Sequence, residues 1–267
     1  MPDNAFHSRL SGPAIFAAVW GRLRLRARRK GIRPRELSRV RSWLKTRYRL
    51  ERPEPRDPLQ NPRHYFPGLS AHAWHEPRSF HWIPRLEDGT ATIRQELAAL
   101  TGNGAFVPYR KDLARQGSWT TYMLWRFGRP ERENTVRCPL TTSLIESLPV
   151  SRDAGLTYLS ALAPGTRVAP HCGPTNTRLR VHLGLFVPDG CGIRVGQESR
   201  TWENGRAIVF DDSFEHEVWN EGDETRYVLI LDIWHPELTA AESWAVAEVE
   251  RASWYSWRPR RRKRASG

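Results

Sequence analysis

The second half of the chain alternates between apolar and polar residues with the two-residue period of β-strands. In residues 178–185 one set of alternate positions is apolar and the other is polar or small. The sets are Leu179, Val181, Leu183 and Leu185 against Arg178, Arg180, His182 and Gly184. Similar short runs, separated by Gly, Pro, Asp or Asn, occupy 156–162, 178–188, 192–196, 206–210 and 226–234. The pattern predicts a sheet domain after about residue 155.

Helical periodicity marks other segments. We predict one helix over 90–102 and another over 141–149, with Thr141 or Thr142 as its N-cap. A helical pattern also follows residue 236. Helices followed by a run of strands indicate a β-sandwich or open barrel with helices packed on one face.

The distribution of charge divides the chain into three parts. The net charge is +13, of which 1–57 contribute +11 (16 basic, 5 acidic), 258–264 contribute +6 (6 basic) and 58–257 contribute −4 (20 basic, 24 acidic). The stretch 51–68 contains five prolines and is typical of a linker or an extended strap. We therefore expect a basic, partly helical segment and linker over 1–57, a sheet domain over 58–250 and a basic tail over 251–267.

The basic ends favour an anionic surface as a partner, although solvated, partly disordered ends are the alternative. Apolar residues at helical spacing precede an Arg/Lys cluster at 22–30, as in a basic amphipathic helix that lies on anionic lipid. These apolar residues are Ala14, Ile15, Ala18, Val19 and Leu23. Basic tracts without interleaved glycine or an aromatic reader module argue against specific nucleic-acid binding.

The same composition indicates a compartment. No apolar run has the length of a membrane span, and we identify no secretory signal. Three widely spaced cysteines, Cys138, Cys172 and Cys191, suit a reducing environment. We expect a cytoplasmic protein, peripheral at a membrane surface if its basic ends bind one. The oligomeric state stays open.

The candidate chemistry lies in the strand-rich half. Its residues, in chain order, are His171, Arg180, His182, His216 and Arg226. Neutral imidazoles bind divalent iron, and an arginine binds a carboxylate through two parallel hydrogen bonds. Two histidines on a metal with arginines nearby would suit a small dicarboxylate that chelates the metal, such as 2-oxoglutarate. The competing interpretation is that the polar strand face is simply hydrated.

The segments HCGPTNTRLRVHLGL, GIRVG, TWENGRAIVFDDSFEHEVWN and RYVLILDIWHPEL resemble the aspartyl/asparaginyl β-hydroxylase family. Residues 58–77 and 117–130 are also similar to that family, so the resemblance covers roughly 58–238. It implies a double-stranded β-helix (jelly-roll or cupin-like) core with flanking helices. It also implies an oxygenase that depends on Fe(II), 2-oxoglutarate as co-substrate and O₂.

Matched residue by residue, the resemblance assigns His171 and His216 to the metal and Arg226 to the distal carboxylate of 2-oxoglutarate. Around the co-substrate it places Arg180, His182 and Ser160, with Trp119 as a looser match close to the pocket. No protein carboxylate completes the metal site in this family, which accounts for Gly173 two residues after His171. Where animal members carry a cysteine pair, this chain has Thr135 and Thr142, with Cys138 alone, so we expect no disulfide there.

The resemblance implies hydroxylation of the β-carbon of an Asp or Asn residue in a peptide or carrier-bound substrate, with Arg178 or Arg194 as candidates to bind an Asp carboxylate. One alternative is hydroxylation of a membrane-lipid acyl chain, and another is a non-catalytic sheet-domain binding protein recruited by its basic ends. For the neighbouring polar residues we expect supporting roles. Asp211 and Asp212 would cap a turn, Asn176 and Asp232 would support the site through hydrogen bonds, Cys172 would be a small buried residue, and His235 would be structural.

Overall fold

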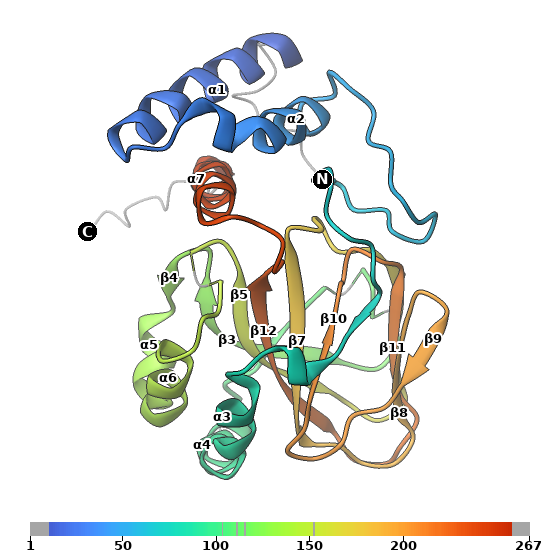
Figure 1. The fold of residues 1–267 in the computed structure, drawn as a ribbon. Helices are drawn as coiled ribbons and strands as arrows, with labels where there is room; N and C mark the ends of the chain where they lie inside the picture. Colours follow the sequence, from blue (N-terminus) through green and yellow to red (C-terminus); the bar gives the residue numbers. More distant parts are fainter. Residues whose placement is uncertain (1–10, 103, 111, 115, 152, 258–267) are drawn as a thin grey trace, which may run out of the picture.

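The computed structural model describes residues 11–102, 104–110, 112–114, 116–151 and 153–257. These residues form two β-sheets, a set of helices against the larger sheet and a helical layer at one end (Figure 1). In this part of the chain no helix combines the length and apolar character needed to cross a membrane.

The major sheet has the strand order β1-β10-β7-β12-β5-β3-β2, and β4 pairs with β3. Its strands are β1 (Trp74–His75), β2 (Val107–Pro108), β3 (Trp119–Arg126), β4 (Arg129–Pro130), β5 (Leu156–Leu162), β7 (Arg178–Phe186), β10 (Ala207–Phe210) and β12 (Arg226–Trp234). The minor sheet has the order β6-β11-β8-β9. Its strands are β6 (Thr166–His171), β8 (Cys191–Val195), β9 (Glu198–Arg200) and β11 (His216–Asn220).

From β5 onward the chain passes repeatedly between the two sheets. Strands β5, β7, β10 and β12 belong to the major sheet, β6, β8, β9 and β11 to the minor one, and the pairings are antiparallel. This alternation is the topology of a jelly roll, or double-stranded β-helix, and confirms the expected fold class. Strand β3, however, lies before residue 155, where only helices were expected. Five consecutive residues of β3 are buried, so both of its faces are covered and its sequence lacks a clear two-residue alternation.

Helices cover the outer face of the major sheet: α3 (Ile83–Asp88), α4 (Thr90–Thr101), α5 (Arg132–Arg137) and α6 (Pro139–Glu146). The apolar residues of β7, such as Val181, pack there with Leu97 of α4. The alternate residues of β7, Arg180 and His182, consequently point between the sheets. Helix α6 begins at Pro139, so the predicted N-cap at Thr141 or Thr142 is wrong. Proline suits a first helical turn because its missing N–H would have no partner there.

The layer at the end of the barrel consists of α1 (Gly12–Arg29), the 3₁₀ helix η1 (Pro34–Leu37), α2 (Ser38–Arg47) and α7 (Ala240–Trp257). A second 3₁₀ helix, η2 (Pro77–Ser79), lies beside β10. Helices α1 and α2 pack on α7 around Leu23, Trp43 and Val246 (Figure 1). Leu23 is therefore buried against protein, and the part of the predicted lipid-facing stripe that included it is wrong. The strongly basic residues 258–264 lie outside the described residues, and the division into three domains stays a prediction.

Candidate metal and anion site

Two histidines from neighbouring strands of the minor sheet face each other. His171 ends β6 and His216 begins β11, and the strand register pairs them directly, with ring centroids 4.2 Å apart. In each ring, Nδ1 lies 2.9 Å from a backbone carbonyl oxygen, that of Ala169 or Phe214. Because a carbonyl oxygen can only accept a hydrogen bond, Nδ1 carries the proton and Nε2 keeps its lone pair. The two Nε2 atoms are thus available to a metal ion.

Burial keeps both rings neutral. It lowers the pKa of His216 to about 3, with a further contribution from His171, and it also lowers the pKa of His171. Neutral imidazole is the form that coordinates a transition metal. Among the described residues, no group of three or more His, Cys, Asp or Glu side chains is arranged to hold a metal ion. In this region the candidate protein ligands of a metal ion are therefore the two imidazoles of His171 and His216.

The space beside Gly173 is occupied by a carboxylate from another segment. A Cβ atom at Gly173 would lie 2.5 Å from the Asp212 carboxylate, whose Oδ2 is 3.0 Å from Nη1 of Arg180. The expected turn cap is confirmed for Asp211, which accepts hydrogen bonds from Ser213 N and Gln60 Nε2. It is wrong for Asp212, because its carboxylate faces the arginine.

A buried arginine lies in the same half of the protein. Arg226 is 2% exposed, and its Nη2 donates to Ser160 Oγ at 3.2 Å, while its Nε has no partner. Trp119 Nε1 donates to the same hydroxyl oxygen at 3.0 Å. No described carboxylate lies within 4.0 Å of this guanidinium, and burial lowers the pKa of Arg226 to about 10. Because an isolated buried charge is costly, this group is prepared for an anionic ligand.

A series of ring contacts joins the histidine pair to Arg226. Phe210 lies 6.0 Å from His216 and 4.9 Å from His182, between ring centroids. His182 stacks on Trp202 at 5.9 Å, and the Arg226 guanidinium lies 4.8 Å from the Trp202 ring. Neither ring nitrogen of His182 has a hydrogen-bond partner, although the residue is 4% exposed. Burial lowers the pKa of His182 strongly, and Arg226 adds to the effect.

Arg180 differs from Arg226 because its charge is already balanced. It pairs with Asp212 and also with Asp232, whose Oδ1 is 3.0 Å from Nη2. The structure thus places all the expected co-substrate residues in one region. Of the guanidinium groups of Arg180 and Arg226, only that of Arg226 has no carboxylate partner among the described residues.

Two residues near this region were missed by the sequence analysis. Thr121 is fully buried, its hydroxyl has no partner, and it lies directly opposite Ser160 across the β3–β5 pair. Trp202 presents an unpartnered Nε1 as well as its ring. Trp202 lies in the segment TWENG that carries the family resemblance, so it could have been suspected. Thr121 had no local signal, because only the strand register brings it to Ser160.

The two expected ligands of a substrate carboxylate are engaged with the protein itself. Arg178 donates to the carbonyl oxygen of Ala154 and pairs with Glu250, and Arg194 pairs with Glu217 at 2.8 Å. Their contact with substrate stays a prediction.

Other polar neighbours hold segments together. Asn176 donates to Phe66 O and accepts from Phe66 N, which fixes the proline-rich strap to the barrel end. Asp232 also accepts from Leu156 N, and His235 accepts from Glu237 N, as its structural role required. Cys172 is half-buried, where a small buried residue was expected.

The positions matched to a cysteine pair in animal relatives are joined by a hydrogen bond. Thr142 Oγ1 donates to the carbonyl oxygen of Thr135 at 3.0 Å, and Cys138 is a buried free thiol. In this chain a hydrogen bond, and not a disulfide, therefore joins α5 and α6 at these positions.

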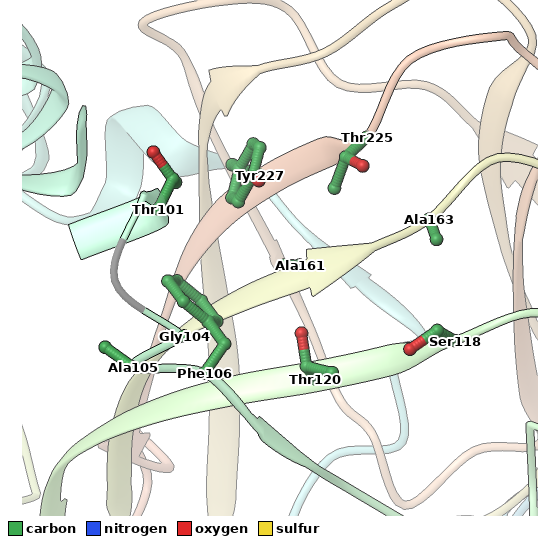
Figure 2. Close-up of a pocket in the computed structure, with 10 residues that line it drawn as sticks. All are labelled: Thr101, Gly104, Ala105, Phe106, Ser118, Thr120, Ala161, Ala163, Thr225 and Tyr227. Carbon is green, nitrogen blue, oxygen red and sulfur yellow. The ribbon is translucent and has the colours of Figure 1, made fainter. Parts of the chain in front are cut away.

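A pocket of about 160 Å³ opens on the other face of the major sheet (Figure 2). Its lining includes Ala161 and Tyr227, which alternate along their strands with Ser160 and Arg226. Successive side chains of a strand point to opposite faces, so this pocket is separate from the histidine–arginine region.

A jelly roll that presents two neutral imidazoles and a buried, unpaired guanidinium defines a candidate metal- and anion-binding protein. The family model for Aspartyl/Asparaginyl beta-hydroxylase matches residues 87–236. The chain belongs to this family, as its sequence motifs indicated.

Individual relatives agree. Human Aspartyl/asparaginyl beta-hydroxylase is 41% identical over 180 residues, which cover 64% of this chain and 24% of that protein. Human Aspartate beta-hydroxylase domain-containing protein 2 is 42% identical over 136 residues, 49% of this chain and 37% of that one. The chain thus spans about a quarter to a third of these relatives.

A bacterial relative is matched over a larger share of its length. Ornithine lipid ester-linked acyl 2-hydroxylase of Rhizobium tropici is 33% identical over 189 residues, 66% of each chain. An oxidoreductase of the 2OG-Fe(II) oxygenase family from Burkholderia pseudomallei superposes with a TM-score of 0.39 at 16% identity, over 52% of this chain and 76% of that one. This likeness is too weak to add to the topology described above.

Proposed function

We propose that this protein is an Fe(II)- and 2-oxoglutarate-dependent dioxygenase that hydroxylates the β-carbon of an Asp or Asn residue in a peptide or carrier-bound substrate. The observation that carries the proposal is a pair of neutral imidazoles connected through ring contacts to a buried guanidinium without a counter-ion. The first element fits a metal, and the second fits the far carboxylate of a metal-chelating dicarboxylate.

The residues take distinct roles in this proposal. His171 and His216 would hold Fe(II) through Nε2, because their Nδ1 atoms are engaged with backbone oxygens. Arg226 would bind the distal carboxylate of 2-oxoglutarate. Ser160 already accepts two hydrogen bonds, so its own hydroxyl proton is free to point to that carboxylate. His182 and Arg180 would line the space between the histidine pair and Arg226.

When bound, Fe(II) and 2-oxoglutarate supply the oxidising chemistry, in which O₂ provides one oxygen atom to the substrate C–H bond and one to succinate, with release of CO₂. The protein contributes orientation and charge. The Arg180 guanidinium, held between Asp212 and Asp232, is positioned rigidly and adds no net positive charge to the substrate side.

The experiment is anaerobic addition of Fe(II) and 2-oxoglutarate to the purified chain, followed by O₂ and measurement of succinate. We expect the charge-transfer absorption of a chelated Fe(II) complex and then succinate, and His216→Ala should lose both. His235→Ala, which changes a histidine outside the pair, is the matched control and should keep both. Absence of metal and 2-oxoglutarate binding in the unmodified protein would reject the proposal in favour of a non-catalytic binding protein.

A lipid acyl chain is the second candidate substrate. It is favoured by the Rhizobium relative, which is named a lipid acyl hydroxylase and is matched over two thirds of each chain. Asp and Asn peptides and ornithine-type lipids should be offered side by side, with mass spectrometry for the addition of one oxygen atom. Hydroxylation of the lipid alone would replace the peptide proposal and leave the proposed cofactor site intact.

A further inference from the structure

The helical layer formed by α1, η1, α2 and α7 separates its positive charges into two groups. Residues 11–50 contain 13 Lys and Arg and one acidic residue, Glu36. Cations that face α7 are paired with its carboxylates: Arg26–Glu248, Arg39–Glu242 and Arg47–Glu250. Seven other arginines are exposed and have no ion-pair partner within the described residues: Arg22, Arg24, Arg28, Arg29, Arg35, Arg41 and Arg49. The inward charges hold the layer together, so the outward ones are not needed for that purpose.

The outer face of α1 combines these cations with an exposed leucine. Leu23 and Ala27 are buried against α7, and Leu25, between them in sequence, points to the other side and is 55% exposed. Residues three or four positions apart lie together on a helix, so Leu25 is surrounded by arginines: Arg22, Arg28 and Arg29. A single exposed leucine is common, but a leucine at the centre of three unpaired guanidiniums is not explained by folding.

A groove of about 410 Å³ lies between α1 and η1 beside this face. Its apolar lining comes from Ala27, Ile32 and Leu37, and Arg24 and Arg28 also line it. Such a groove offers apolar surface together with two cations that are free to bind a phosphate oxygen.

We propose that the outer face of α1, with this groove, docks on an anionic lipid bilayer. The arginines meet phosphate headgroups, and Leu25 enters the boundary between headgroups and acyl chains. Charge complementarity requires an anionic partner, and the exposed leucine and apolar groove distinguish a bilayer from a nucleic acid, which would use polar and stacking groups.

The docked face lies at the same end of the molecule as the histidine pair. Helix α7 follows β12, whose last residue Trp234 pairs with Arg178 at the start of β7. The short connection that leads into Arg178 begins at His171. In Figure 1 α1 lies outside α7 at this end of the barrel. Docking through α1 therefore brings the end of the barrel that carries the histidine pair to the membrane side.

The test is flotation of the full chain with phosphatidylcholine vesicles that do or do not contain phosphatidylglycerol. Removing one cation near an anionic surface lowers the partition coefficient about fivefold. We expect Arg24→Gln/Arg28→Gln to weaken binding roughly 20-fold. Leu25→Ser, which keeps the net charge, should weaken it roughly tenfold by loss of apolar burial.

The matched control is Arg85→Gln/Arg137→Gln, which removes two exposed charges on α3 and α5, in the lower half of the view in Figure 1. It should retain binding within about twofold of the unmodified chain. Thermal unfolding of each variant confirms that the fold is kept, and succinate formation with a water-soluble substrate should be unchanged in all. An equal loss in the control pair would overturn the proposal, because binding would then follow net charge alone. Binding that prefers an oligonucleotide and survives Leu25→Ser would overturn it in favour of nucleic acid.

Discussion

Replacement of Arg226 by methionine should make the ligand-free protein more stable and at the same time abolish its response to 2-oxoglutarate. The residue is buried without a carboxylate partner among the described residues, and its Nε is unsatisfied. Methionine has a similar length and no charge, so it removes the electrostatic cost and retains most of the packing against Trp202.

The size of the effect follows from the cost of burying the charge. Burial lowers the pKa of Arg226 to about 10, well below the ordinary value of an arginine side chain. A folded pKa below the unfolded one means that the protonated side chain destabilises the fold by the full amount at every pH below about 10. The cost disappears gradually as the pH rises from there to the pKa of the unfolded chain. At about 1.4 kcal/mol per pKa unit the cost is roughly 3 kcal/mol at neutral pH. The lost bond to Ser160 offsets about 1 kcal/mol, so we expect a net gain of roughly 2 kcal/mol.

The assay is differential scanning calorimetry in a buffer without carboxylates, with and without Fe(II) and 2-oxoglutarate. A gain of this size should raise the Tm of Arg226→Met by about 4–8 °C. Saturating 2-oxoglutarate at a hundred times its Kd stabilises a binding protein by about 2.7 kcal/mol, and the variant should show none of this shift. A lower Tm without ligand, together with a preserved 2-oxoglutarate shift, would show that Arg226 is a structural residue and not the anion site.

Three further predictions concern other residues. Thr121→Val should weaken 2-oxoglutarate binding about threefold to tenfold in calorimetric titration, because the variant lacks the buried hydroxyl that would hydrogen-bond to the ligand. Thr121→Ser keeps a hydroxyl and should bind normally. If Thr121→Val and Thr121→Ser bind 2-oxoglutarate equally well, Thr121 is excluded from the site. Gly173→Ala should lower the free energy of unfolding in urea by about 1–3 kcal/mol, because its Cβ meets the Asp212 carboxylate, and unchanged stability would contradict the close approach. Stability should also fall between pH 7 and pH 5, because burial lowers the pKa of His64 to about 3 and of His235 to about 4, so that the unfolded chain binds more protons in this range. Each histidine should contribute about 1–2 kcal/mol to this loss of stability, and His235→Asn should make the dependence of stability on pH less steep. An increase in stability between pH 7 and pH 5 would refute the assignment of the effect to buried neutral histidines.

Local pattern was sufficient for much of the fold. The strands at 156–162, 178–186 and 226–234 were predicted because each buries one apolar face or both. Strand β3 and the short strand β6 were not predicted. The first is buried on both faces, so it lacks the alternation that identifies a half-exposed strand. The second is short and carries a proline and few β-branched residues, so its sequence gives a weak strand signal.

For the candidate site, the sequence indicated individual residues but not all of their contacts. The motifs selected His171, His216, Ser160 and Arg226 as candidates. The structure pairs the two histidines and brings Arg226 to Ser160, and their roles stay a prediction. The partners of Arg180 were not foreseen, because Asp212 comes from the turn after β10 and Asp232 is brought opposite Arg180 only by the β7–β12 register.

By itself the sequence determined the family, the jelly-roll core and the residue types available for chemistry, since strand periodicity and motif spacing are properties of a linear chain. Only the tertiary structure decided which charges are free. Arg180 and Arg226 look alike in sequence, yet one is neutralised by two carboxylates and the other is buried without any. That difference depends on side chains brought together from distant strands, and the energy of a buried charge depends on these neighbours and not on its own position in the chain.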